Sequence, residues 1–244
     1  MTEDVPKPLA SVIWMRPQRG ARGPEPSRDR DTIAATAIRI ADAEGIAAAS
    51  MRRIAAEIGS GTSSLYRYFA RKDDLINLMV DGALTLGALE LSGNWRDDLM
   101  AIGWATRRTF LTHPWLATAL AGRPTLGPNR LAALELMLGV FSDELPATER
   151  LIIIDTLTSF VRGFVASELA DGAAIRESGL SAELWHAEQA AYAAAIEASG
   201  VYPRTTRLFA ESRSAGSLQP QEESFAAGLD LILDGVEAKL AVRR

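Results

Sequence analysis

Among its 244 residues the sequence has no cysteine and only two histidines, His113 and His186. The absence of cysteine excludes a disulfide framework and any cysteine-based metal site. A nucleophilic triad needs a histidine within reach of a serine and an acid, and neither histidine lies in such a motif. The patterns HExxH, GxSxG, GxGxxG and GxxxxGK[ST] do not occur in a supporting context either. We therefore expect no enzyme, no metal and no cofactor.

A helical enzyme with an Asp-rich metal motif is also disfavoured. The pairs Asp73-Asp74 and Asp97-Asp98 are isolated, and both begin expected helices, where the helix dipole favours carboxylates.

Long apolar runs are missing too: no segment has about 18 consecutive apolar residues, so we expect no membrane span. The start MTEDVPK lacks the basic-then-apolar pattern of a secretion signal, which favours a cytoplasmic location.

The most informative stretch is SMRRIAAEIGSGTSSLYRYFARK, residues 50–72, which predicts two short helices joined by a tight turn. Ser50 is a typical N-cap, and the apolar stripe that follows it ends at Gly59. Gly61 in the turn is expected to take a positive φ. This pattern is typical of a helix-turn-helix.

The second of these helices, predicted over residues 64–69 with Thr62 or Ser63 as its cap, has little to bury. Only Leu65 and Phe69, at i and i+4, point toward a core. Exposed hydroxyl, tyrosine and arginine side chains suit phosphates, base edges and thymine methyls, and a major groove admits one α-helix. The side chains left outside are those of Ser63, Ser64, Tyr66, Arg67 and Tyr68.

An ordinary αα-hairpin inside a helical domain is the alternative interpretation, because short hairpins with a glycine turn are common. The exposed polar and aromatic helix favours DNA, since such a surface is costly unless a partner covers it. Charge agrees: residues 1–72 hold 12 Lys+Arg and 8 Asp+Glu, a net of +4, whereas residues 73–244 hold 14 and 23, a net of −9. This asymmetry suits a basic reading head on an acidic body.

Residues 1–26 are rich in proline and arginine, so helix is not expected there and disorder is the default. They are either a leader without a role or a basic arm that enters the minor groove. A helix over residues 27–44 follows, from an N-cap at Ser27 to a stop at Gly45, and the next helix after the motif begins near Lys72.

The body, residues 73–244, has a helical pattern throughout. No run alternates with a period of two, so strands are not expected. Breaker residues are concentrated at 171–181 and 201–220. The fold class is therefore all-α, with a three-helix DNA-binding domain at 27–72 and a larger helical domain behind it. The expected helices from there on cover about 72–91, 95–111, 114–121, 128–145, 147–170, 182–199 and 221–241.

These features resemble the TetR family of bacterial repressors. The motifs that carry the resemblance are AAEIG at 55–59, SLYRYF at 64–69, KDDL at 72–75, NWR at 94–96, HPW at 113–115, LGPN at 126–129 and FAAGLDLILDG at 225–235. The resemblance implies a repressor that binds double-stranded DNA at a palindromic operator and is released by a small-molecule inducer. The residues it places at the DNA are Arg52, Thr62, Ser63, Ser64, Tyr66, Arg67, Tyr68 and Lys72, with Arg53 ranked second because it could instead be solvated.

Two expected helices carry more apolar surface than one neighbour covers. The helix at 147–170 is apolar on most of its circumference, and the helix at 221–241 has a long apolar stripe. Both could fill the core of one chain, or they could pack against a two-fold copy as a four-helix bundle. A homodimer is favoured, because a palindromic operator needs a two-fold reader, and the resemblance implies the same pair of helices. The expected interface residues are Leu157, Phe160, Phe225, Leu229, Ile232 and Val236.

Aromatic and methionine side chains gather in the middle of the body, where they could line an apolar cavity with few polar groups. Packing in the core is the alternative, and for any single residue it is the more common outcome. Arg108 and His113 are further polar neighbours of this cluster. The expected ligand-binding residues are Trp104, Arg107, Trp115, Met137, Phe141, Phe164 and Trp185.

One departure from the family limits the ligand. In tetracycline-responsive members a histidine at about the position of Leu120 helps hold the drug's magnesium, and no histidine or carboxylate replaces it here. The inducer is therefore expected to bind without metal, and its identity is open. The alternative function is a helical dimeric ligand-binding or scaffold protein without DNA binding, against which the exposed face of Tyr66, Arg67 and Tyr68 argues.

Overall fold

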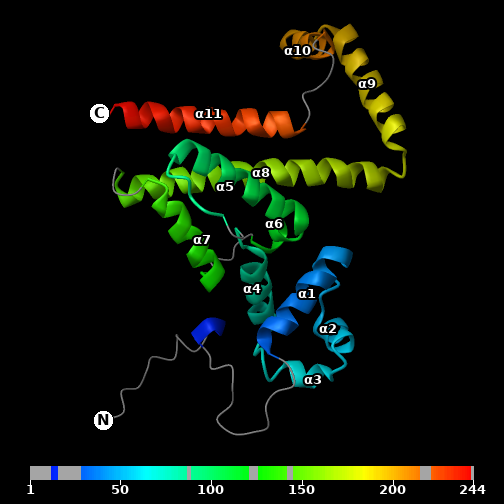
Figure 1. The fold of residues 1–244 in the computed structure, drawn as a ribbon. Helices are drawn as coiled ribbons and strands as arrows, with labels where there is room; N and C mark the ends of the chain where they lie inside the picture. Colours follow the sequence, from blue (N-terminus) through cyan, green and yellow to red (C-terminus); the bar gives the residue numbers. More distant parts are fainter. Residues whose placement is uncertain are drawn as a thin grey trace. The chain divides into compact units, whose positions relative to one another are not determined.

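The computed structural model describes residues 12–15, 29–86, 89–120, 126–141, 145–214 and 221–242. Within these ranges every long element is a helix and no strand occurs, so the predicted all-α fold is confirmed (Figure 1). The chain forms two compact units, one ending at Thr158 and one beginning at Ser159. The functional division expected at residue 72 falls inside the first unit and stays a prediction. In the described part of the chain, no helix combines the length and apolar character needed to cross a membrane.

The head of the first unit is made of α1 (Arg30–Glu44), α2 (Met51–Glu57) and α3 (Thr62–Leu65). Ile33 and Ile54 are completely buried between them. The predicted cap of the first helix was wrong, because Asp29 rather than Ser27 is the N-cap of α1. The Asp29 carboxylate accepts a hydrogen bond of 2.7 Å from the backbone N–H of Thr32.

Helix α4 (Lys72–Ala83) packs along α1 and leads from the head into the body (Figure 1). Leu75, Met79 and Val80 form its buried face. The predicted end near residue 91 was wrong, since α4 stops at Ala83 although the apolar residues continue through Leu84 and Leu86. Gly82 lies in the last turn of α4, directly before this end.

The rest of the first unit consists of α5 (Trp95–Thr112), α6 (Leu116–Ala119), α7 (Pro128–Gly139) and the first part of α8 (Ala147–Ser178). The side chain of Asn94 caps α5 by accepting from the backbone N–H of Arg96 at 3.0 Å. Pro128 opens α7, where its fixed φ suits the first turn and its missing N–H costs nothing. The expected continuation of α7 to residue 145 was wrong, because the helix ends at Gly139.

The second unit contains the remainder of α8, α9 (Ala182–Ser199), α10 (Pro203–Ser214) and α11 (Gln221–Ala241). The helices predicted over 182–199 and 221–241 are confirmed at both ends. The breakers predicted at 171–181 and 201–220 were partly wrong, because α8 continues to Ser178 and α10 lies within the second stretch. Gly172 alone does not stop α8, and Pro203 begins α10.

Three aromatic rings hold α8 and α11 together in the second unit. The rings of Phe160 and Phe225 stack with centroids 5.6 Å apart, and Phe164 meets Phe225 edge-on at 5.2 Å. Gly228 faces the Phe160 ring so closely that an added Cβ would overlap it. This close approach fixes where α11 crosses α8 within the chain.

Candidate nucleic-acid interface

Helix α2 and helix α3 form the predicted helix-turn-helix. The Ser50 side chain caps α2, accepting from the backbone N–H of Arg53 at 3.2 Å, as expected. The positive φ lies at Gly59 (+63°), two residues earlier than predicted. Gly61 has a φ of −78° and is itself the N-cap of α3, so the expected roles of Gly61, Thr62 and Ser63 in the turn were wrong. Gly59 directly follows the C-cap of α2, where helices commonly end on a residue in the left-handed conformation.

The side chains of α3 and the turn that continues it separate into two sets. Leu65 and Phe69 are completely buried, as predicted. Tyr66 is 55% exposed, the largest exposed ring of the head. Tyr68 is half-buried, with its ring 6.4 Å from that of Phe69. Of the other predicted DNA contacts, exposed side chains belong to Arg52, Ser63, Arg67 and Lys72, and half-buried ones to Thr62 and Ser64.

Arg53, which the sequence ranked behind Arg52, is engaged within the head. Its guanidinium forms ion pairs with Glu57 and with Glu44, the latter at 3.1 Å. Hydrogen bonds from Arg53, and then from Arg39, hold the pKa of Glu57 below its ordinary value. The same carboxylates raise the pKa of Arg53. Arg53 therefore braces α2 against α1, whereas the Arg52 side chain projects to the surface.

Asp74 determines the path of the chain from α3 into α4. Its buried carboxylate accepts from the backbone N–H groups of Ala70 at 3.0 Å and Arg71 at 3.1 Å. Only the dipole position of Asp74 was predicted from the sequence, and its capping role was missed. Lys72 lies in the turn that Asp74 caps. Its side chain is exposed, as are those of Tyr66 and Arg67.

Arg30 lies behind the interface, and no sequence pattern indicated its role. Its side chain is 8% exposed, although arginine is seldom buried. Its Nε donates a hydrogen bond of 3.2 Å to the backbone carbonyl of Tyr68. The first turn of α1 thereby holds the end of the recognition segment.

The predicted ligand-binding residues have different environments. Trp115 and Phe141 are buried, and Phe141 stacks on Trp95 with centroids 6.0 Å apart, so these rings are packed in the body. Trp104 is half-buried, with the guanidinium of the buried Arg107 at 5.6 Å from the centroid of its ring. The remaining three, Met137, Phe164 and Trp185, are half-buried.

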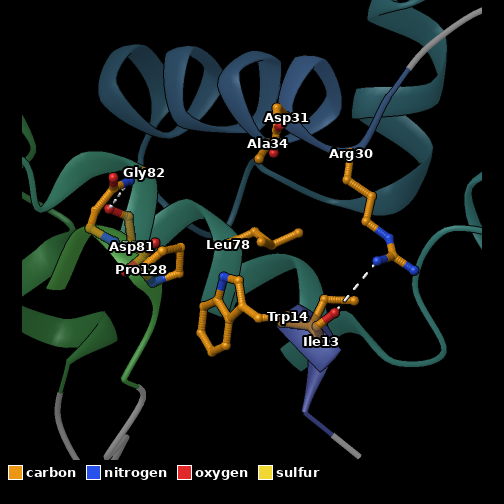
Figure 2. A pocket seen from close by; sticks show the side chains of 10 residues that line it. Ile13, Trp14, Arg30, Asp31, Ala34, Leu78, Asp81, Gly82 and Pro128 are labelled. Carbon is orange, nitrogen blue, oxygen red and sulfur yellow. Dashed lines mark hydrogen bonds between the residues drawn. The ribbon is translucent and has the colours of Figure 1, made fainter. Parts of the chain in front are cut away.

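Described residues of the first unit line two of its cavities. One, of about 410 Å³, lies beside α5 and the end of α4, and Arg108, Thr109 and His113 are among its lining residues. The other, of about 380 Å³, lies where α1, α4 and α7 meet (Figure 2). None of the seven predicted ligand residues lines either cavity. No cluster of three or more potential metal ligands occurs among the residues that the structure describes.

The predicted dimer residues are mostly covered within the single chain. On the same two helices, the exposed apolar side chains include Ile152 (61%) and Leu231 (74%). These surface residues were not among the six predicted. Of the six, Leu157, Phe225, Leu229 and Val236 are buried, and Phe160 and Ile232 are half-buried.

Two family profiles match the chain. The profile described as "Bacterial regulatory proteins, tetR family" covers residues 33–79, and "Tetracyclin repressor-like, C-terminal domain" covers residues 88–240. The chain belongs to the TetR family. The resemblance inferred from the sequence motifs is thus confirmed.

The TetR-family relatives include proteins that match along most of their length. The HTH-type transcriptional repressor DrrR1 of Streptomyces coeruleorubidus is 37% identical over 96% of this chain and 86% of its own. ActR of Streptomyces coelicolor, solved in complex with actinorhodin, superimposes with a TM-score of 0.67 at 26% identity, over 88% of this chain and 99% of ActR. Apo ActR gives a TM-score of 0.66 at 26% identity, over 86% and 97%.

Family membership and geometry agree on the class of activity. This TetR-family chain is a DNA-binding transcriptional regulator with a helix-turn-helix head and a larger helical domain. The TetR family consists of transcriptional regulators rather than enzymes, in line with the missing catalytic motifs.

Proposed function

We propose that the chain is a homodimeric repressor that reads a palindromic operator and is released from it by a small molecule. The observation that carries the DNA part is the exposed face of α3 and its following turn. Tyr66 is more than half exposed on a segment whose buried side chains are Leu65 and Phe69. Such a face is costly in water and fits the width of a major groove.

Each predicted DNA contact has a separate role in this proposal. Tyr66 and Arg67 reach base edges, since aromatic and guanidinium groups make apolar and bidentate contacts there. Lys72 contacts a phosphate at the start of α4, which fixes position without reading sequence. Tyr68 contributes less, because its ring is half-buried. The remaining contacts, by Arg52, Thr62, Ser63 and Ser64, go to phosphate oxygens and neighbouring bases.

The dimer forms through α8 and α11 in this proposal, as expected from the sequence. Since Leu229 and Val236 are already covered in one chain, the surface offered to a second copy is the outer face of each helix. Leu231 is the most exposed large apolar side chain of α11, and Ile152 is that of α8. A two-fold pair of such faces is the geometry that a palindromic site requires.

The ligand binds in the helical body and is apolar or weakly polar. Support comes from α5, whose Arg108 and Thr109 line the 410 Å³ cavity. The same helix carries Trp104 one turn before Arg108, and Arg107 with its guanidinium beside the Trp104 ring. That volume is in the range of small-molecule sites. ActR, which resembles this chain, has been solved with actinorhodin and with (S)-DNPA, so ligands of that kind are the first candidates.

The DNA proposal is tested by selection of duplexes from a randomised library with the purified protein. A palindromic consensus supports the proposal, and the absence of any enriched duplex contradicts it. The ligand proposal is tested by adding actinorhodin to the selected complex and recording DNA release and tryptophan fluorescence. Release that is weakened in Arg108→Ala, with DNA affinity intact, supports a site at this cavity, because Arg108 is one of its lining residues. Release unchanged in Arg108→Ala contradicts that site.

A further inference from the structure

The segment Val12–Met15 lies against the DNA-reading head although it precedes α1 by many residues. Residues 13–15 form a single 3-10 turn that contacts α4, and Ile13 is 2% exposed. The expectation of a structureless leader over residues 1–26 was therefore wrong for this turn, and the rest of that stretch lies outside the described residues. Burial of one isoleucine in so short a segment makes the turn part of the folded head.

Arg30 joins this turn to the recognition segment. One guanidinium nitrogen lies 3.5 Å from the backbone carbonyl of Ile13, and Nε donates to the backbone carbonyl of Tyr68 at 3.2 Å (Figure 2 shows the first contact). Arginine presents its donors in a fixed planar fork, so one side chain holds two carbonyls at a set separation. The position of Ile13 and the position of the turn after α3 are thereby linked.

Trp14 ties the same turn to the body. Its ring lies near the start of α7, where Cζ2 would be 2.6 Å from a Cβ added to Gly127. There the buried carboxylate of Asp81 on α4 accepts from the backbone N–H groups of Asn129 at 3.2 Å and Arg130 at 3.0 Å. Ile13 and Trp14 therefore contact the point where α4 meets both α1 and α7, at the edge of the 380 Å³ cavity (Figure 2).

We propose that the turn at Ile13–Met15 is an anchor that positions the recognition segment on DNA, with Arg30 as the positioning residue between them. The proposal rests on the DNA-reading function proposed above. Arg30 is buried and contacts carbonyls of the chain, so its role is to orient Tyr66, Arg67 and Tyr68 rather than to bind phosphate. Loss of the anchor leaves the recognition segment present but less well oriented.

The test uses the full chain and a duplex selected by the wild-type protein from a randomised library. Ile13→Asp removes the anchor, and Met15→Asp is its control, because it adds the same charge in the same turn at a side chain that is 63% exposed. Arg30→Met removes the donors and keeps the length of the side chain. Affinity is measured by fluorescence anisotropy over a range of salt concentrations, and amide hydrogen exchange is followed in the turn after α3.

We expect Ile13→Asp to bind DNA about tenfold more weakly than Met15→Asp. Arg30→Met should bind about tenfold more weakly than the wild type, in line with the loss of a hydrogen bond from a charged group. The double variant should be no weaker than either single one, because both break one linkage. Exchange in the turn after α3 should be faster in both single variants. The salt dependence should keep its slope, since no phosphate contact is lost.

Equal affinities for Ile13→Asp and Met15→Asp would overturn the anchor. A slope reduced by about one in Arg30→Met would also overturn it, because that result means direct phosphate binding. Should Ile13→Asp fail to fold, Ile13→Ala against Met15→Ala makes the same comparison. Failure of the wild-type protein to select any duplex would instead contradict the proposed DNA function, so the two failures are distinguishable.

Discussion

The indole N–H of Trp115 donates a hydrogen bond of 2.7 Å to the carboxylate of Asp42. Asp42 lies on α1 in the head, and Trp115 precedes α6 in the body, so this bond joins the two parts within the first unit. The same Asp42 oxygen lies 2.7 Å from Nδ1 of His113. Trp115 is therefore engaged in a structural contact that the sequence motif HPW did not reveal.

Replacement of Trp115 by phenylalanine is expected to lower the free energy of unfolding by about 2 kcal/mol, the usual range for a hydrogen bond to a charged group. Thermal unfolding followed by circular dichroism measures the loss. Trp185→Phe is the control, because Trp185 is only half-buried on α9. Equal changes in melting temperature for the two variants would contradict the structural role of the bond.

The sequence predicted the helices best where local signals and packing agree. Ser50, Leu65 and Phe69 were assigned correctly because a capping hydroxyl and an i, i+4 apolar pair act over one turn. The ends of α4 and α7 were predicted too late, since Ala83 and Gly139 are followed by apolar residues that helical periodicity alone would continue.

The sequence predicted the exposed side chains of the candidate site, but not the buried residues that hold them in place. Outward Tyr66 and Arg67 follow from helical periodicity. Arg30, Asp74 and Ile13 act through contacts between residues distant in sequence or through backbone N–H groups, which periodicity does not encode. Leu229 was predicted at the dimer interface but is buried within one chain. An apolar stripe predicts that a helix face is covered, and it does so equally for a neighbour in the same chain and for a second copy.

Lys72→Ala should weaken binding to all DNA sequences alike and lower the slope of log affinity against log salt by about one, because one phosphate contact is lost. Lys72 is exposed at the start of α4, so the fold should be unaffected. Lys239→Ala, in the last turn of α11, is the control for a change in net charge. An unchanged slope in Lys72→Ala would mean that this lysine does not contact phosphate.

If the proposed dimer forms through α11, Leu231→Glu should yield a folded monomer, because Leu231 is 74% exposed in the single chain. Leu229→Glu, two residues away, should instead unfold the chain by burying an unpaired carboxylate, at a cost of several kcal/mol. Sedimentation and circular dichroism distinguish the two outcomes. A wild-type monomer at micromolar concentration, or a Leu231→Glu variant that remains dimeric, would refute this interface.

The N-cap of α1 should make stability depend on acid pH. Hydrogen bonds from the side chain and the backbone of Thr32 lower the pKa of Asp29 from its ordinary value of 3.8. A carboxyl with a lowered folded-state pKa stabilises the fold above its unfolded pKa, and the benefit is lost as pH falls through the folded-state value. Asp29→Ala should therefore lower the free energy of unfolding at neutral pH, by about 1 kcal/mol as for other N-cap substitutions, and by less once the pH lies below both pKa values.

Urea unfolding of the wild type and Asp29→Ala at a series of pH values measures this difference. Asp31→Ala is the control, because Asp31 is exposed in the same first turn of α1. A gap between wild type and Asp29→Ala that stays constant down to the lowest pH at which both fold would contradict the capping account.

The central claim, that α3 and its following turn read DNA, is tested most directly by the affinity of Tyr66→Ala for the duplex selected by the wild-type protein. Tyr192→Ala is the control, because Tyr192 is also an exposed tyrosine, on α9, at 67% against 55% for Tyr66. We predict a loss of about 1–3 kcal/mol of specific binding for Tyr66→Ala, with the fold unchanged by circular dichroism. Wild-type affinity in a folded Tyr66→Ala variant would contradict the assignment of the recognition helix.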